Sequence, residues 1–218
     1  MAFSGSSATV STLSARDANA ADLGASFVAI TAVPGTGQIG PVATTFVETT
    51  PYLHLYNAGS LTIYPTFLKL HVTVVSTGGA GSRVQFTQIL DSGPSRWSSA
   101  GTALTISNTN MNSVVTSGAQ LRVGVPVLTA ATANRRILSH RVYRAVIDVV
   151  EDTYLFSWGA PDSQAMSSII TSGTGVVAAL HNYPPVAIGP GQNFAIYHWG
   201  ADITVGTTFE VEFAYYEK

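Results

Sequence analysis

Cysteine is absent from this 218-residue sequence, and charged side chains are scarce. Without cysteine the chain has no disulfide, no thiolate metal site and no thiol nucleophile, so packing must stabilise the fold. Charged residues make up 10% of the chain, well below the roughly 25% that is usual for a soluble domain. The surface must therefore be unusually neutral, and such a surface suits packing against other subunits.

Positive charge is scarce as well. The net charge is −2, and Lys69 and Lys218 are the only lysines, so the chain lacks the basic arm that neutralises phosphates. The arginines between residues 135 and 144 are better interpreted as strand residues with exposed or paired charges than as a phosphate patch. We therefore expect no direct contact with nucleic acid.

Long apolar runs are also missing. No segment approaches the roughly 18 uninterrupted apolar residues that a membrane span requires. Residues 1–14 are small and polar, without the charged and apolar regions of a signal peptide. We expect a product that is made in the cytoplasm, has no membrane association and leaves the cell only within a larger assembly or by lysis.

Strand patterns dominate what is present. Residues 67–75 place aliphatic side chains on one face and Lys69, His71 and Thr73 on the other, and residues 208–216 alternate in the same way. This two-residue period predicts half-buried strands. Further β-rich runs between turn residues predict strands at 45–48, 52–56, 61–64, 84–90, 104–107, 121–127, 137–150, 153–158, 176–180 and 193–199.

One pair of runs predicts a hairpin. Residues 137–150 and 153–158 are separated only by Glu151 and Asp152, and a two-residue connection favours tight antiparallel pairing. No helix of normal length fits the sequence, and no repeat of fixed period is present.

These patterns predict an all-β fold, an antiparallel two-sheet β-sandwich that is jelly-roll-like. Residues 27–218 form the single sandwich domain, and residues 1–26, rich in Ser and Ala, form an extended or weakly helical N-terminal arm. Four longer polar stretches are predicted contact loops, at residues 76–82, 91–102, 108–112 and 160–175.

Enzyme signatures are missing. Residues 35–40, Gly-Thr-Gly-Gln-Ile-Gly, have the spacing of a dinucleotide-binding loop, but Pro41 and a strand-like run follow where that motif needs a helix. We interpret the segment as a glycine-rich turn. The five histidines lie in different predicted elements, so we predict no catalytic residue, no metal site and no cofactor.

An aromatic strand near the C-terminus offers two interpretations. Phe194, Ile196 and His198 share one predicted face, and Tyr197 and Trp199 share the other. The favoured interpretation is packing between sheets or subunits. The alternative is a ligand site with stacking aromatic rings.

Trp97 stands in a polar loop between serine and arginine neighbours. If exposed, its ring could anchor a sugar or a neighbouring subunit. If tucked back, it would pin the loop. The sequence leaves both interpretations open.

Glu210 and Glu212 share one strand face, about 7 Å apart by strand geometry. That spacing could serve hydrolysis of a glycoside by two carboxylates. A solvated strand face is the more common reason for such a pattern.

The chain's C-terminal part resembles the ending of structural proteins of tailed bacteriophages. The resemblance covers residues 184–199, where a Pro-Gly turn leads into an aromatic strand, and residues 209–217, a last strand with alternating acidic and aromatic residues. It includes no catalytic motif.

This resemblance implies a jelly-roll-like virion subunit, such as a decoration, minor capsid or tail protein. Such a subunit is made in the host cytoplasm, located in the virion, and forms a homo-oligomer, often a trimer, with other virion proteins as partners. The chain departs from a major capsid protein of tailed phages, which would be longer and carry a long helix.

Two other functions stay open. One is a glycan-binding module of a tail fibre or lectin, using Trp97, Tyr197 and Trp199. The other is an enzyme acting on glycosides, with Glu210 or Glu212 beside a histidine in a cleft.

Overall fold

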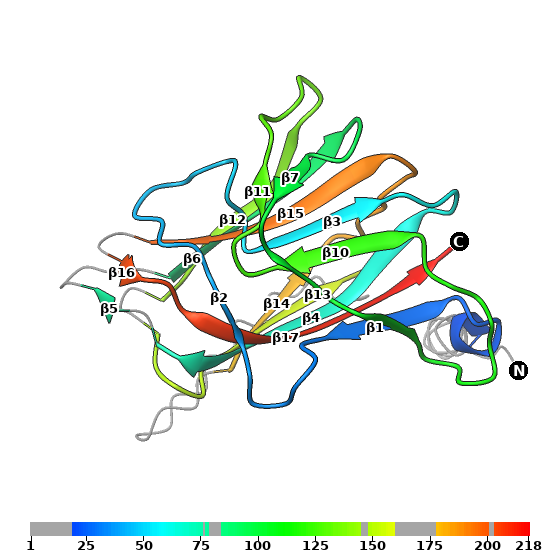
Figure 1. Ribbon diagram of the computed structural model, residues 1–218, viewed down its shortest axis with the longest axis horizontal. Coiled ribbons are helices and arrows are strands. Elements are labelled where there is room, and N and C mark those ends of the chain that lie inside the picture. The colour runs from blue at the N-terminus through cyan, green and yellow to red at the C-terminus, as the bar shows by residue number, and fades with distance from the viewer. Residues whose placement is uncertain (1–18, 76, 79–83, 145–147, 160–177, 201–202) are drawn as a thin grey trace, which may run out of the picture.

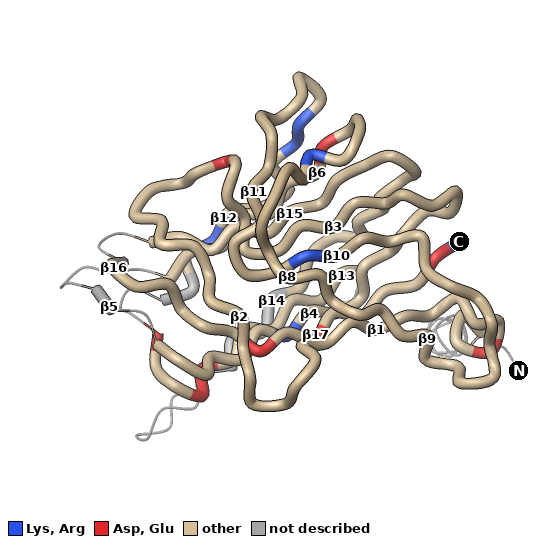
Figure 2. The backbone as a smooth tube through the Cα atoms, in the orientation of Figure 1, with Lys and Arg blue, Asp and Glu red and all other residues tan. Residues whose placement is uncertain are grey.

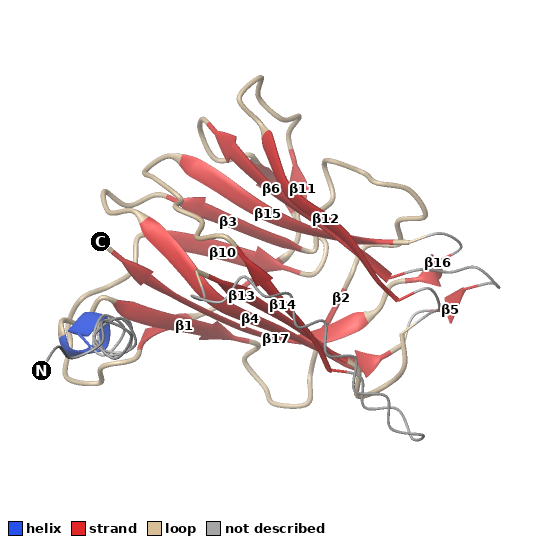
Figure 3. Cartoon of the chain, turned by 180° about the vertical axis from the view of Figure 1, so that it is seen from behind, coloured by secondary structure: helices blue, strands red, loops and turns tan. Residues whose placement is uncertain are grey.

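The computed structural model describes residues 19–75, 77–78, 84–144, 148–159, 178–200 and 203–218. Two layers of strands lie face to face, with a single helical turn at residues 19–22 beside the start of the first strand (Figures 1 and 3). Within these residues no helix is long and apolar enough to cross a membrane.

Sheet A contains the first and last strands of the fold. Its order is β14-β13-β4-β17-β1-β9, and β2 also pairs with β17. The bounds are β14 Ala178–Tyr183, β13 Thr153–Trp158, β4 Ile63–Val74, β17 Thr208–Glu217, β1 Ser26–Ile30, β9 Ile106–Asn108 and β2 Gln38–Ile39.

Sheet B packs against it, in the order β12-β6-β15-β3-β10-β8. The bounds are β12 Arg136–Arg144, β6 Val84–Ser92, β15 Gln192–Trp199, β3 Leu53–Asn57, β10 Ala119–Val123 and β8 Thr102–Ala103. Two small strand pairs complete the fold, formed by β7 Trp97–Ser99 with β11 Val127–Leu128 and by β5 Thr77–Gly78 with β16 Ile203–Val205.

The main strands pair in a nested order. β1 pairs with β17, β3 with β15, β4 with β13 and β6 with β12, all antiparallel. The chain therefore forms one long hairpin that is rolled so that its strands are shared between two sheets, which is the jelly-roll topology. The predicted two-sheet, jelly-roll-like sandwich is confirmed.

The core lies between the sheets because the strands alternate buried and open residues. In β17 the residues Phe209, Val211, Phe213 and Tyr215 are buried while their neighbours are more exposed. Apolar side chains of both sheets join in one cluster, including Leu68 and Leu70 of β4, Leu53 and Leu55 of β3, and Phe194 and Ile196 of β15. The two-residue period in the sequence thus identified the buried face correctly.

The predicted hairpin of residues 137–150 with 153–158 is wrong. β12 belongs to sheet B and β13 to sheet A, so the chain crosses from one layer to the other between them. Asp152 donates its backbone N–H to the carbonyl of Val149, and Glu151 has a φ of 74°. Glu151 and Asp152 therefore form a turn, as predicted, but it leads into a different sheet.

Two further local predictions are corrected. Residues 45–48 are not a strand, because they form part of a loop that lies over sheet B, where the carbonyl of Glu48 accepts a hydrogen bond from the Tyr197 hydroxyl.

β13 and β14 are parallel, an exception to the predicted antiparallel pairing. Parallel neighbours need a long crossover, and the chain between Trp158 and Ala178 supplies that length.

The glycine motif at residues 35–40 is a turn, as predicted. No helix follows it, because β2 begins at Gln38 and pairs with β17. A Cβ atom on Gly37 would lie 2.7 Å from the carbonyl carbon of Phe209. Glycine is needed here because the turn lies directly on β17.

The N-terminal arm is described only in part. The helical turn at residues 19–22 agrees with a weakly helical end of the arm, and β1 begins at Ser26. Residues 1–18 lie outside the described part of the chain, as do the polar stretch at 160–175 and most of the stretch at 76–82.

Candidate functional site

Tyr197 lies on the outer face of sheet B, on the opposite side of β15 from the core. The structure confirms the predicted division of this strand, because Phe194, Ile196 and His198 belong to the interior. Tyr197 is nonetheless buried, since Phe46 packs on its ring at 5.0 Å and its hydroxyl donates to the Glu48 carbonyl at 2.8 Å. Burial raises its pKa to about 12, so the hydroxyl stays protonated and can donate the hydrogen bond that holds the covering loop in place.

Trp199 lies beside this cluster and is half-buried. Its indole Nε1 donates to the Thr87 hydroxyl at 3.0 Å, and its ring stacks on His140 with centroids 5.3 Å apart. The Thr87 hydroxyl also contacts Nδ1 of His140 at 3.0 Å. Trp199 therefore joins β15 to β6 and to the edge strand β12.

Trp97 is both partly exposed and held against its own loop, so both interpretations that the sequence left open apply in part. The residue is 37% exposed. At the same time its Nε1 donates to the carbonyl of Ala100 at 2.9 Å, and the guanidinium of Arg122 lies 3.7 Å from the ring centroid. The ring is fixed in orientation while part of it faces solvent.

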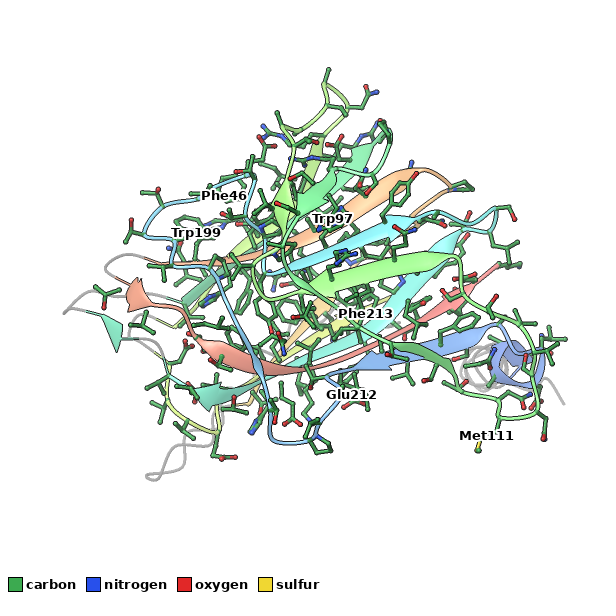
Figure 4. All side chains as sticks on the ribbon, in the orientation of Figure 1. Phe46, Trp97, Met111, Trp199, Glu212 and Phe213 are labelled. Carbon is green, nitrogen blue, oxygen red and sulfur yellow. The ribbon has the colours of Figure 1, made fainter. Side chains whose placement is uncertain are left out.

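The three aromatic residues do not form one site. Trp199 lies next to Phe46, with ring centroids 6.2 Å apart, and Figure 4 places Trp97 well away from both. Trp97 belongs to the small β7–β11 ribbon that projects above sheet B in Figure 1. A ligand contacting Trp97 would thus not use Tyr197 or Trp199.

A buried polar network attaches this ribbon to sheet B. Arg96 and Asp91 form an ion pair at 3.3 Å, with side chains only 3% and 2% exposed. Arg96 also donates to the carbonyl of Thr129, and Asp91 accepts from both the backbone and the hydroxyl of Thr132. The long segment between β6 and β12 is therefore held at both ends by one charge pair.

Asn193 and His54 extend the network along the same face. The Asn193 Oδ1 lies 3.0 Å from Nε2 of His54 and accepts the backbone N–H of Arg96 at 3.0 Å. Burial, together with the nearby positive charges of Arg96 and Arg122, lowers the pKa of His54 to about 4. His54 is thus neutral at physiological pH and serves packing.

An open cleft of about 490 Å³ lies at the end of β6 and β15. Residues 133–136 line it together with Asp91 and Gln192. Arg135 is paired with Glu48 and Asp91 with Arg96. This leaves Arg136 as the cation able to meet an acidic group in the cleft.

The two carboxylates of the enzyme alternative lie on the outer face of sheet A. Glu212 pairs with Lys69 at 3.7 Å, and Glu210 accepts the backbone N–H of Gly35 at 2.8 Å. His71 lies opposite Glu210 in register and contacts Glu151 at 3.3 Å. None of these residues lines the cleft beside Arg136.

A second buried polar group lies inside the sandwich. Asp148 accepts hydrogen bonds from the hydroxyls of Tyr154 and Thr207. His198 is packed between Phe86 and Phe209, and neither of its ring nitrogens has a hydrogen-bond partner among the described residues. Burial lowers the pKa of His198, and the charge of Asp148 opposes this in part.

In the part of the chain that the structure describes, no three His, Asp or Glu side chains are grouped so that they could hold a metal ion.

The sequence analysis did not identify the ion pair of Asp91 with Arg96 or the buried amide of Asn193. Their types gave no signal, because an aspartate or arginine in a polar stretch is usually solvent-exposed.

Comparisons with known proteins add no family. No family model matches the chain, and neither a curated protein nor a solved structure matches it. The function therefore has to be argued from the sequence and the geometry of this chain.

Proposed function

We propose that this chain is a structural subunit of a virion, a capsid or capsid-decoration protein that associates with copies of itself and stabilises the particle. The resemblance of its C-terminal part to phage structural proteins supports the proposal. So does the jelly-roll topology, although a fold by itself does not define a function.

The observation that carries the proposal is a rigid loop that presents apolar side chains to solvent. Met111 is 98% exposed and Val114 is 95% exposed, and both lie in the loop between β9 and β10. Figure 4 shows Met111 pointing away from the molecule. No other part of the described chain covers either side chain.

Hydrogen bonds fix the loop in that position. The Asn108 side chain donates to the carbonyls of Gly24 and Val115, and the Asn110 side chain donates to Ala21 and Asp22. The loop is therefore tied to the helical turn at residues 19–22. Exposed apolar groups on a fixed scaffold are typical of a contact surface between proteins.

The test is a double substitution, Met111→Ser with Val114→Ser. Burial of two such side chains at a contact contributes roughly 1.5–3 kcal/mol each, so self-association should weaken by about tenfold or more. The melting temperature should stay unchanged because neither side chain packs on the core. Asn112→Ser in the same loop is the matched control and should assemble like the wild type.

A glycan-binding module is the second candidate, and Trp97 is the observation that favours it. An indole ring that is partly exposed and backed by the Arg122 guanidinium offers a fixed apolar face on which a sugar ring can stack. Tyr197 is excluded from such a site by its burial.

A glycan array distinguishes this candidate. A reproducible signal that Trp97→Ala abolishes, with an unchanged melting temperature, would support glycan binding. If the wild-type protein gives no signal on the array, glycan binding is ruled out as the function.

A further inference from the structure

The small ribbon of β7 and β11 carries Trp97 over the outer face of sheet B. The backbone N–H of Arg96 donates to the side chain of Asn193 on β15 at 3.0 Å, which fixes the start of the ribbon on the sheet. The next side chain, Trp97, reaches past β3 to the Arg122 guanidinium on β10, 3.7 Å from its ring centroid. The ring therefore lies above strands of sheet B, although it belongs to the ribbon.

Two polar side chains lie beside Arg122 on this face. Strand alternation places Gln120 and Arg122 on the outer face of β10, since the other residues of this strand belong to the core. Tyr56 lies opposite Gln120 in the register of β3 and also faces outward. Gln120 is exposed, whereas Tyr56 and Arg122 are half-buried. We call Tyr56, Trp97, Gln120 and Arg122 the Trp97 surface.

The charge of Arg122 stands alone on this half of sheet B. Strands β15, β3, β10 and β8 contain no other Asp, Glu, Lys or Arg, and Figure 2 shows this charge as the blue segment beside the β8 and β10 labels. Arg96, at the base of the ribbon, is already paired with Asp91. Among the described residues no carboxylate forms an ion pair with Arg122. Its positive charge is therefore available to an anionic ligand.

The groups of this surface suit a sugar that carries a carboxylate. Stacking on Trp97 uses the flat face of the guanidinium and leaves its edge N–H groups free to donate. Such an edge matches a carboxylate, which can accept two parallel hydrogen bonds. The amide of Gln120 and the hydroxyl of Tyr56 can bond sugar hydroxyls beside that contact. The indole supplies an apolar face on which a second sugar ring can stack.

We infer that the Trp97 surface binds an oligosaccharide that carries carboxylate groups. One sugar stacks on the indole, and the carboxylate of the next sugar meets the guanidinium edge of Arg122. This inference rests on glycan binding, the second candidate function, and names the class of glycan. A neutral glycan could use the indole but would gain nothing from the charge of Arg122.

Matched ligands test the charge preference on the wild-type protein. Trigalacturonate and its methyl ester have the same sugar rings, but only the first carries carboxylates. Isothermal titration calorimetry should give an affinity about tenfold or more higher for the acid, as expected of a charge-assisted contact. Sialyllactose and lactose form a second pair, so the pair that shows the preference tells whether the carboxylate belongs to a uronic acid or a sialic acid.

Substitutions locate the contact. Arg122→Gln should bind the acid no better than the ester, because it removes the cation and keeps a polar side chain. Trp97→Ala should weaken binding of both. Arg136→Gln is the matched control, since it removes an equal charge from the cleft beside β12 and should bind like the wild type. Thermal melts verify folding, and if Arg122→Gln does not fold, the comparison of ligands on the wild type still decides the charge preference.

The outcomes separate this inference from the function on which it rests. Equal affinities for the acid and the ester, lost together in Trp97→Ala, would overturn the charge preference and leave glycan binding standing. An array that shows only neutral glycans would do the same. A preference for the acid that Arg122→Gln keeps and Arg136→Gln loses would place the carboxylate in the cleft and overturn the assignment. If no glycan binds at all, the inference and glycan binding both fail, and the structural role is unaffected.

Discussion

At the scale of single residues, buried polar groups determine how the loops are attached to the sandwich. Asp91, Arg96 and Asn193 are all buried on the outer face of sheet B, where they satisfy one another and the backbone of the covering ribbon. Buried charges are tolerated only when they are paired and hydrogen-bonded. Removing one member should therefore cost more than removing the pair.

The first prediction concerns this pair. Arg96→Met leaves Asp91 buried without its cation, so the free energy of unfolding should fall by about 3–5 kcal/mol. Adding Asp91→Asn should recover part of the loss, since no uncompensated charge then remains. Urea denaturation of both variants checks this. Equal losses for the single and double variants would show that the charge of Asp91 is unimportant.

The second prediction concerns the buried imidazole of His198. Burial lowers its pKa below the ordinary value of 6.5, so the unfolded chain binds this proton at a higher pH than the folded chain does. The free energy of unfolding should therefore fall as the pH drops below about 6.5 and stay level above it.

The comparison variant for this prediction is His198→Phe. Phenylalanine suits the neighbours Phe86 and Phe209 and removes two polar atoms without partners. Between about pH 7 and about pH 5 it should lose less stability than the wild type does. Thermal melts across this range provide the measurement, and parallel pH profiles would contradict the assignment. His54, with its pKa near 4, contributes in the same direction in both proteins.

At the scale of elements, the nested strand order decides the fold. β12 pairs with β6, although a segment running from Gly93 to Arg135 separates them. β13 follows β12 closely along the chain but lies in the other sheet. The pairing of β6 with β12 is thus the feature that distinguishes a jelly roll from a sheet of local hairpins.

The third prediction tests this pairing by a designed disulfide. Gln85 and Val142 lie opposite each other in the register of β6 and β12, and such a pair has Cα atoms about 5 Å apart, which a disulfide can span. Gln85→Cys with Val142→Cys should crosslink on oxidation, detected by mass spectrometry. The chain has no other cysteine to interfere.

The matched control moves one cysteine along the strand. Leu138 lies four residues from Val142, roughly 13 Å away along β12, so Gln85→Cys with Leu138→Cys should not crosslink within one molecule. A crosslink in the control and none in the designed pair would contradict the register.

Much of this architecture was predictable from the sequence, because alternation is a local property. The runs that became β4 and β17 showed their buried face through residues such as Leu70 and Phe213. The division of β15 into an inner face with His198 and an outer face with Tyr197 followed from the same period. Closely spaced runs could not reveal their partners, since pairing depends on contacts distant in sequence, and so the hairpin of β12 with β13 was wrong.

The candidate site was predicted less well. Trp97, Tyr197 and Trp199 were chosen for their chemistry, but only the fold could show that Phe46 covers Tyr197 and that Trp97 stands apart. Met111 lies in the stretch 108–112 that the sequence predicted as a contact loop, but Val114 lies beyond that stretch and was not singled out. The side chains of Asn108 and Asn110 hold this loop against residues 21–24 and 115 through hydrogen bonds. The contacts with residues 21–24 join segments that are distant in the sequence, so the local sequence does not reveal them.

At the scale of the whole molecule, the sandwich has a closed apolar interior and a surface with few charges. A low content of charge reduces repulsion between copies, and the charges that remain are divided by sign between the two sheets. Apolar side chains are held outward at the loop between β9 and β10 and on the edge strand β12. These features support the proposal that copies of the chain associate.

Analytical ultracentrifugation of the purified wild-type chain over a wide range of concentration tests this account most directly. We expect the average mass to rise above that of a single chain as concentration increases. A single monomeric species at every concentration, with no binding to other virion components, would contradict the account.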